Sequence, residues 1–124
     1  MQTFLILEDE PLIAMDLKMA FEDAGYAAVT TIDNSEAISC IEQSNIEGAI
    51  LDVSLGGGET CRKTADCLSE RKIPFILHTG DLDRVGESLR AIDAPVIAKP
   101  RPADDVIAAL LTLLGSTKPP VETH

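Results

Sequence analysis

Residues 46–54 read Ile-Glu-Gly-Ala-Ile-Leu-Asp-Val-Ser, and this stretch decides the fold. Its apolar run, 49–51, is typical of a strand that is buried on both faces of a sheet. The run ends on the carboxylate of Asp52, and a glycine-rich loop follows at 56–58. A carboxylate at the end of a buried strand is costly unless a charged or hydrogen-bonding group pairs with it. Because Asp is also a common capping residue, the role of Asp52 depends on the rest of the chain.

The composition indicates one folded domain in a reducing compartment. Of the 124 residues, 45% are hydrophobic and only 3% are aromatic, so the core must be mainly aliphatic. The net charge of −11 argues against direct nucleic-acid binding, because phosphate contacts need Lys and Arg. No apolar run approaches the ~20 residues of a membrane span, and the N-terminus does not resemble a secretory signal. The three cysteines have no metal-type spacing, so we expect reduced thiols in a cytoplasmic protein without a membrane partner.

Five short apolar segments alternate with segments of helical periodicity. The expected strands are 3–7, 27–32, 46–52, 73–78 and 95–98. The expected helices are 11–24, 34–43, 59–71 and 103–114, with a weaker one at 81–90. This alternation predicts an α/β fold, in which a doubly wound five-stranded parallel sheet carries helices on both faces. Right-handed crossovers then bring the carboxyl ends of all strands to one edge of the sheet.

The helical segments carry specific expectations for their faces and ends. In the first helix, one apolar stripe is Ile13, Leu17, Phe21 and Ala24, and a second stripe that widens it is Leu12, Met15 and Met19. Asn34 or Ser35 is expected to cap the second helix. The core-facing positions of the third are expected to be Cys61, Ala65 and Leu68. Gly115 is expected to stop the last helix, which leaves residues 116–124 as a flexible tail after a domain of residues 1–115.

Polar side chains stand at the ends of four expected strands. They are Glu8, Asp9, Asp52, Thr79 and Lys99. Three carboxylates at one edge repel one another, which raises at least one pKa unless a cation lies among them. Oxygen-only ligands favour a hard ion such as Mg²⁺, which also attracts phosphoryl groups. Asp52 could then act as a nucleophile that forms an acyl phosphate, with Lys99 and Thr79 contacting the phosphoryl oxygens.

With these residues in place, the chain resembles the receiver domain of two-component response regulators over about residues 3–115. The matching points are the Glu8–Asp9 pair, Asp52, Thr79 and Lys99–Pro100. The resemblance implies a flavodoxin-like (βα)5 fold. It also implies that Asp52 is the phosphoacceptor, which takes a phosphoryl group from a phosphohistidine of a sensor histidine kinase or a histidine phosphotransfer protein.

The resemblance further implies the ligands and the role of the site. Mg²⁺ would be bound by Asp9, Asp52 and the backbone carbonyl of Ser54, with Glu8 acting largely through water. The peptide bond before Pro100 would be cis. The protein would be a signalling module rather than an enzyme, catalysing only its own phosphorylation and dephosphorylation. Helix 103–114, the strand before it and segment 81–90 would form the surface read by a downstream protein partner.

Two positions depart from the usual receiver pattern, and one segment resembles a particular branch of the family. Val96 stands where family members usually have an aromatic residue, and Arg101 stands where Phe is frequent. Segment 74–80, Pro-Phe-Ile-Leu-His-Thr-Gly, instead resembles more loosely a branch of receivers called the FAT GUY group. We therefore expect switching to occur mainly by ordering of residues 80–92, with Thr79 alone reporting the phosphoryl group.

Several alternative functions remain open at this level. A degenerate receiver could act as a phosphorylation-independent interaction module. An aspartyl-phosphate phosphatase would normally need an acid two residues after its nucleophile, where Ser54 stands. A nucleotide phosphate loop at 56–58 lacks the GxxxxGK[ST] pattern. His78 lacks partner ligands for zinc and is expected to line the end of the fourth strand.

The sequence is compatible with two kinds of parent protein. Residues 116–124 are too few to form a DNA-binding or catalytic output domain. The chain is therefore either a stand-alone receiver, which the start at Met1 favours, or a segment of a longer regulator or hybrid kinase.

Overall fold

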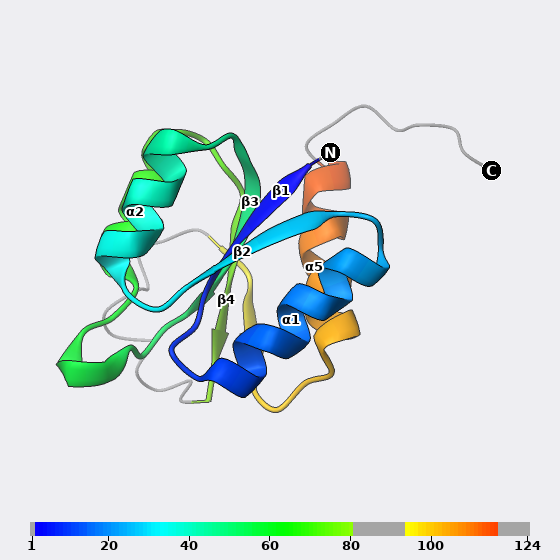
Figure 1. Ribbon diagram of the computed structural model, residues 1–124, viewed down its shortest axis with the longest axis horizontal. Coiled ribbons are helices and arrows are strands. Elements are labelled where there is room, and N and C mark those ends of the chain that lie inside the picture. The colour runs from blue at the N-terminus through cyan, green and yellow to red at the C-terminus, as the bar shows by residue number, and fades with distance from the viewer. Residues whose placement is uncertain (1, 81–93, 117–124) are drawn as a thin grey trace.

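The computed structural model describes residues 2–80 and 94–116. The described residues form five parallel strands, which are β1 (Thr3–Leu7), β2 (Ala27–Thr31), β3 (Ile46–Asp52), β4 (Phe75–Thr79) and β5 (Val96–Ala98). They also form four α-helices, which are α1 (Pro11–Asp23), α2 (Asn34–Gln43), α3 (Arg62–Glu70) and α5 (Ala103–Ser116). The strand order is β2-β1-β3-β4-β5, with every pairing parallel (Figure 1). The predicted doubly wound α/β fold is confirmed.

Helices cover both faces of the sheet, which explains why the strands are apolar at nearly every position. Helices α1 and α5 pack on one face, whereas α2 and α3 pack on the other (Figure 1). Under α1 and α5 the core contains Phe4, whose ring stacks on Phe21 with centroids 4.8 Å apart. Under α2 and α3 the core is aliphatic apart from Phe75 and Cys61. The two cores fix the sheet between them, so the ends of its strands have defined positions.

Helix α1 differs from the prediction in the width of its buried face. Ala14, Leu17, Ala20 and Phe21 are buried against the sheet and α5, while the predicted second stripe is exposed. The exposed fractions of Leu12, Met15 and Met19 are 78%, 56% and 53%. Ala24, which was expected on the buried face, is the exposed C-cap residue, and Gly25 follows it with φ of +92°. The prediction of a wide apolar face was wrong because this stripe lies on the side of the helix away from the sheet.

Three helix ends also differ from the predictions. The cap of α2 is Asp33, whose Oδ1 accepts a hydrogen bond of 2.8 Å from the backbone N–H of Glu36. Helix α3 begins at Arg62, because residues 54–60 instead form a loop with a 3-10 turn at Gly56–Gly58. Gly115 does not stop α5, which continues through Ser116. Cys61, Ala65 and Leu68 are fully buried, as predicted.

Some expectations fall on residues that the structure does not describe. The weak helix at 81–90, most of the segment expected to order on switching at 80–92, and residues 117–124 of the expected tail lie outside the described ranges. Cys40, Cys61 and Cys67 lie inside them and are free thiols. In residues 2–80 and 94–116, no helix has the length and apolar character needed to span a membrane.

Candidate functional site

The candidate site continues the rows of side chains that face α1 and α5. On this face the strands carry Ile6, Ile50, Ile76 and Ile97. Because side chains alternate between the faces of a sheet, the residues two positions further along point to the same side. Those residues are Glu8, Asp52, His78 and Lys99. On each of these four strands an apolar side chain is thus followed, on the same face, by a polar one. Because the strands are parallel, the four polar side chains form one cluster at the carboxyl edge of the sheet.

Three carboxylates and one ammonium group form the centre of this cluster. One carboxylate oxygen from each of Glu8, Asp9 and Asp52 lies within 4.8 Å of the others. Lys99 Nζ lies 3.1 Å from Glu8 Oε1 and 3.4 Å from Asp52 Oδ1. The exposed fractions of Glu8 and Asp52 are only 2% and 5%, whereas Asp9 is exposed. Two buried acids therefore share one cation, and a third acid lies toward solvent.

The electrostatics of the cluster leave Asp52 easy to protonate. Burial first, and then the charge of Glu8, raise the pKa of Asp52 to about 7, although the charge of Lys99 acts in the opposite direction. For Lys99, burial lowers the pKa, but the contacts with Glu8 and Asp52 outweigh burial and raise it overall. The amine thus stays charged while the negative charge around it is in excess. An added cation beside Asp52 would relieve that excess.

A cavity of about 290 Å³ opens above this cluster. Its walls include Asp9, Asp52, Ser54, Thr79 and Lys99, from four different strand ends. Thr79 is buried, with 1% of its surface exposed. These five residues, which were candidates from the sequence, therefore line one cavity in the structure. Glu8 does not line it but contacts Lys99, which does. The peptide bond between Lys99 and Pro100 is cis.

The donors around this cavity fit a hard divalent cation. Three carboxylates supply oxygen ligands close enough to share one ion. Neither sulfur nor imidazole is among the three clustered ligands, which disfavours zinc and copper. Mg²⁺ binds through one or two carboxylates and keeps several waters, so the exposed position of Asp9 suits it.

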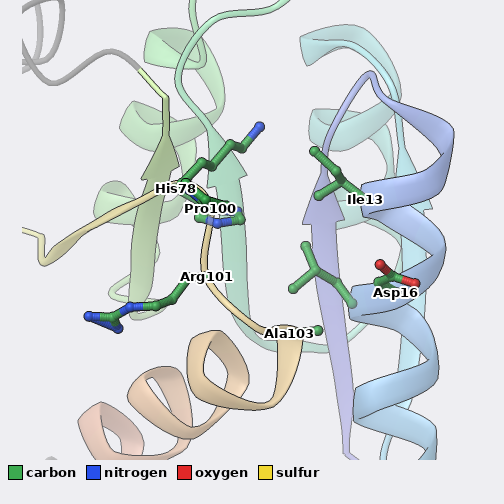
Figure 2. A pocket seen from close by; sticks show the side chains of 8 residues that line it. Ile13, Asp16, His78, Pro100, Arg101 and Ala103 are labelled. Carbon is green, nitrogen blue, oxygen red and sulfur yellow. The ribbon is translucent and has the colours of Figure 1, made fainter.

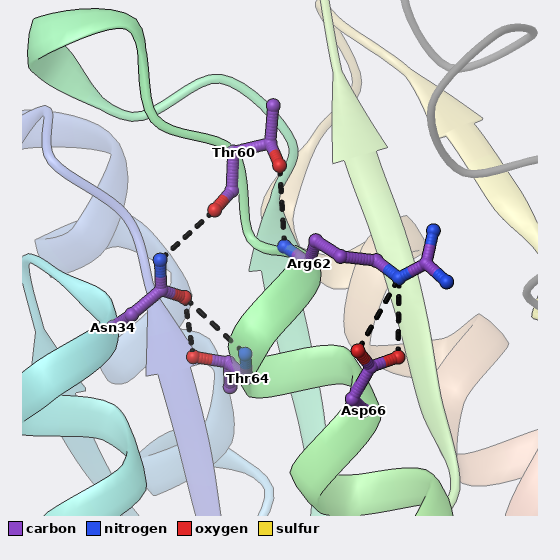
Figure 3. Close-up of polar contacts among 5 residues, drawn as sticks. All are labelled: Asn34, Thr60, Arg62, Thr64 and Asp66. Atoms are coloured by element: carbon purple, nitrogen blue, oxygen red, sulfur yellow. Dashed lines mark hydrogen bonds and ion pairs between the residues drawn. The ribbon is translucent and has the colours of Figure 1, made fainter.

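The loop that carries Ser54 is fastened to α2 by a buried asparagine. Asn34 Nδ2 donates a hydrogen bond of 2.9 Å to the carbonyl of Thr60, which pairs with Ser54 in an isolated β-bridge. Asn34 Oδ1 accepts hydrogen bonds from the hydroxyl and backbone N–H of Thr64, at 2.6 Å and 3.3 Å (Figure 3). One side chain thus joins the start of α2, the loop and the start of α3.

Replacing Asn34 with Ala is expected to lower the free energy of unfolding by about 1–3 kcal/mol, because the partly buried carbonyl of Thr60 and the buried hydroxyl of Thr64 lose their partner. Urea denaturation of both proteins measures this difference. Ser35→Ala, one position along and exposed, is the matched control and should change stability by less than about 0.5 kcal/mol. Equal stability of the Asn34 variant and the wild type would contradict the role assigned to this side chain.

The sequence reasoning missed two features of this region. Asn34 was expected only as a helix cap, and its tertiary role follows from its burial at 5% exposure. His78 was expected to line the end of a strand. The sequence reasoning did not predict that it lies directly opposite Asp52 in the β3–β4 register. The signal for His78 was available, since this histidine directly follows the apolar run at 75–77.

Comparison with known proteins places the chain among signalling proteins. No family model matches it. It is 34% identical over 109 residues to the phyllosphere-induced regulator PhyR of Methylorubrum extorquens, which covers 86% of this chain. The chain spans 41% of the length of that relative.

Solved structures are also similar to this chain over most of its length. The solution structure of SdrG from Sphingomonas melonis Fr1 is 40% identical, covers 92% of this chain and 96% of its own, and superposes with a TM-score of 0.76. A CheY-like response regulator receiver domain protein from Methanospirillum hungatei JF-1 shares the fold, with a TM-score of 0.81, 24% identity and coverage of 94% and 95%. The chain has a parallel five-stranded sheet with an acidic cluster at its carboxyl edge, and it is similar to these proteins. It therefore belongs to the receiver domains of response regulators.

Proposed function

We propose that this receiver domain, residues 1–115, accepts a phosphoryl group on Asp52. The observation that carries the proposal is the position of the Asp52 carboxylate. It lies 3.4 Å from Lys99 Nζ, within the cluster of three acids, and it lines the cavity open to the strand ends. A nucleophile, a cation for the phosphoryl oxygens and oxygen ligands for a metal are therefore close together.

The transfer step uses groups that the cavity already holds. A carboxylate oxygen of Asp52 attacks the phosphorus of a phosphohistidine, the P–N bond breaks, and the histidine nitrogen keeps the bonding electron pair. A new P–O bond leaves an acyl phosphate on Asp52. The ammonium group of Lys99 and the hydroxyl of Thr79 bind phosphoryl oxygens, which lowers the barrier by positioning and charge stabilisation.

Mg²⁺ is the metal that we assign to the acidic cluster. Asp9, Asp52 and the backbone carbonyl of Ser54 would hold it, with Glu8 contributing largely through water. When bound, the ion neutralises charge that develops on the phosphoryl oxygens. One structural neighbour, the response regulator TrrA from Thermotoga maritima, was solved in complex with Mg²⁺-BeF.

Membership of the receiver family supports the phosphodonor and the output that we propose. Receiver domains act with histidine kinases or histidine phosphotransfer proteins and with downstream protein partners. Phosphorylation of Asp52 would switch the surface for such a partner, which we propose to consist of α5, β5 and residues 81–90. Val96, which replaces the usual aromatic residue, is 40% exposed at the start of β5. We therefore propose that the switch works through Thr79 and the order of residues 80–92.

The decisive experiment is intact-mass analysis after incubation with acetyl phosphate, with and without Mg²⁺. The wild type is expected to gain one phosphoryl group only when Mg²⁺ is present. Asp52→Asn should gain none, since an amide is not a nucleophile for this step. Asp66→Asn, an exposed carboxylate paired with Arg62, is the matched control and should behave as the wild type does.

Two results would count against this function. An adduct that persists in Asp52→Asn would show that another residue accepts the phosphoryl group. No adduct on the wild type, either with acetyl phosphate or with a phosphorylated histidine phosphotransfer protein, would favour the phosphorylation-independent interaction module. In that case Asp52→Asn should also leave partner binding intact.

A further inference from the structure

The sheet itself positions one flank of the proposed phosphoryl site. The backbone N–H of Lys99 donates a hydrogen bond of 2.8 Å to the carbonyl of Thr79, at the end of β4. Figure 2 shows this flank, where His78 and Pro100 border a second cavity of about 250 Å³ that Lys99 also lines. The hydrogen bonding of the sheet therefore continues up to Lys99.

Ser54 lies outside the sheet, in the loop between β3 and α3. It lines the metal and phosphoryl cavity, and its proposed metal ligand is the backbone carbonyl. Rotation of a side chain cannot reposition a backbone oxygen, so its place depends on the path of the loop. The loop also approaches Asp9, because a Cβ atom on Gly56 would lie 3.8 Å from Asp9 Oδ2. A metal site that is formed in advance therefore requires a loop that is held in place.

The two arms of this loop are joined to each other by backbone contacts. Residues 56–58, at its tip, are exposed. Behind the tip, the backbone N–H of Leu55 donates a hydrogen bond of 2.9 Å to the carbonyl of Glu59. Ser54 itself pairs with Thr60 in an isolated β-bridge. A group that holds Thr60 therefore also holds Ser54.

The side chain of Asn34, at the start of α2, holds Thr60. Its Nδ2 donates a hydrogen bond of 2.9 Å to the carbonyl of Thr60 and a longer one of 3.4 Å to Glu59 Oε1. Its Oδ1 accepts from the hydroxyl and backbone N–H of Thr64. Because the Thr60 carbonyl can only accept and the Thr64 N–H can only donate, the amide has one orientation that satisfies both. Contacts outside the loop thus direct the donor of Asn34 at the loop.

We propose that Asn34 is a positioning residue for the metal site, which holds the carbonyl of Ser54 through Thr60 and so raises the affinity for Mg²⁺. The inference rests on the proposed function, since it requires Mg²⁺ at Asp9, Asp52 and Ser54. Groups that orient metal ligands change metal affinity by roughly 10–100-fold. Asn34 acts through the backbone rather than on the ligand itself, so its removal should have an effect at the lower end, of about tenfold.

The test is a titration of the full chain with Mg²⁺, followed in amide ¹H–¹⁵N spectra. The amide of Leu55 belongs to the same peptide group as the Ser54 carbonyl, so its shift reports on the proposed ligand. In Asn34→Ala the dissociation constant of Mg²⁺ should be about tenfold higher than in the wild type. Ile41→Val removes one buried methyl group about two turns further along α2, and it is the matched control. It should lower stability but leave the dissociation constant unchanged.

The outcomes separate this inference from the proposed function. A wild type without saturable shifts at Leu55 would overturn the metal site and, with it, the inference. A wild type that binds Mg²⁺ no more tightly than Asn34→Ala would overturn the inference alone. So would an equal rise of the dissociation constant in Ile41→Val, since loss of stability rather than the loop contact would then weaken metal binding.

A measurement on the wild type covers the case in which Asn34→Ala does not fold. Coupling between two equilibria is reciprocal, so Mg²⁺ must strengthen the hydrogen bond to Thr60 by the factor by which that bond strengthens Mg²⁺ binding. Hydrogen exchange of the Asn34 Nδ2 protons should therefore slow about tenfold at saturating Mg²⁺. The Nε2 protons of Gln43, exposed at the end of the same helix, are the control and should exchange at an unchanged rate. The same exchange rate for Asn34 with and without Mg²⁺ would contradict the proposal.

Discussion

Asp52→Asn is expected to stabilise the folded protein at pH 8 by on the order of 2–4 kcal/mol. Asp52 is 5% exposed and lies with Glu8 and Asp9 around one ammonium group. Ionising it in the folded state therefore adds negative charge where there is already an excess. An amide has nearly the same shape and carries no charge, so the substitution removes the repulsion and leaves Lys99 paired with Glu8.

The gain in stability of Asp52→Asn over the wild type should depend on pH, within a window set by the folded and unfolded pKa of Asp52. Burial and Glu8 raise the pKa of Asp52 from 3.8 in the unfolded chain to about 7 in the folded protein. Between these values the folded state binds more protons than the unfolded state, so stability is lost as pH rises through the window. The wild type and the variant should therefore be nearly equal at pH 4 and differ most above pH 7. His78, whose pKa is lowered to about 4, has the opposite effect on stability but is present in both proteins.

Urea denaturation of both proteins at pH 4, 6 and 8 measures this difference. Asp66→Asn is the control for the loss of a negative charge, and its side chain is 54% exposed. It should change stability by less than about 1 kcal/mol at every pH. Saturating Mg²⁺ should stabilise the wild type more than Asp52→Asn, since it supplies the missing cation. A variant that is less stable than the wild type at pH 8 would show that the carboxylate is favourably paired instead.

Lys99→Met is expected to destabilise the protein by about 3–5 kcal/mol at pH 8. Its Nζ is the cation that lies between Glu8 and Asp52, 3.1 Å from Glu8 Oε1 and 3.4 Å from Asp52 Oδ1. Methionine replaces the apolar stem but leaves two buried carboxylates without that charge. Breaking a buried ion pair by removing one partner is costly because the remaining charge stays desolvated.

The loss should shrink when the acids are neutralised. At pH 5 Asp52 is already mostly protonated, so Lys99→Met should cost less than at pH 8. Combining it with Asp52→Asn should recover part of the lost stability, and a double-mutant cycle gives the coupling between the two side chains. Lys18→Met, which removes an exposed ion pair with Glu22, is the matched control. A loss that is the same at both pH values would indicate that packing, rather than charge, is responsible.

Much of the fold could be predicted because local signals and the global topology agree. The apolar run before Asp52 is a strand because both faces of the sheet are covered, and its boundaries at Ile46–Asp52 match the pattern. The alternation of strands and helices fixed a parallel sheet, and the parallel arrangement brought Asp9, Asp52, Thr79 and Lys99 to one cavity. Residue identity at strand ends was sufficient to find the candidate site.

Periodicity alone could not decide which apolar residues are buried. Met15 and Met19 follow helical spacing as well as Leu17 does, but only Leu17 faces the sheet. The difference depends on how α1 is rotated against α5 and the strands, and that rotation is a property of the packed molecule. Asn34 shows the same limit, because a capping residue and a buried hydrogen-bonding residue have the same local sequence signal.

The sequence by itself determined the element order, the parallel sheet and the set of polar residues at its carboxyl edge. Only the tertiary structure decided their pairwise contacts, with Lys99 between Glu8 and Asp52 and with His78 opposite Asp52 beside a second cavity. The physical reason is that side-chain alternation and crossover handedness act within short segments. Strand register and helix rotation depend instead on the packing of segments far apart in the chain.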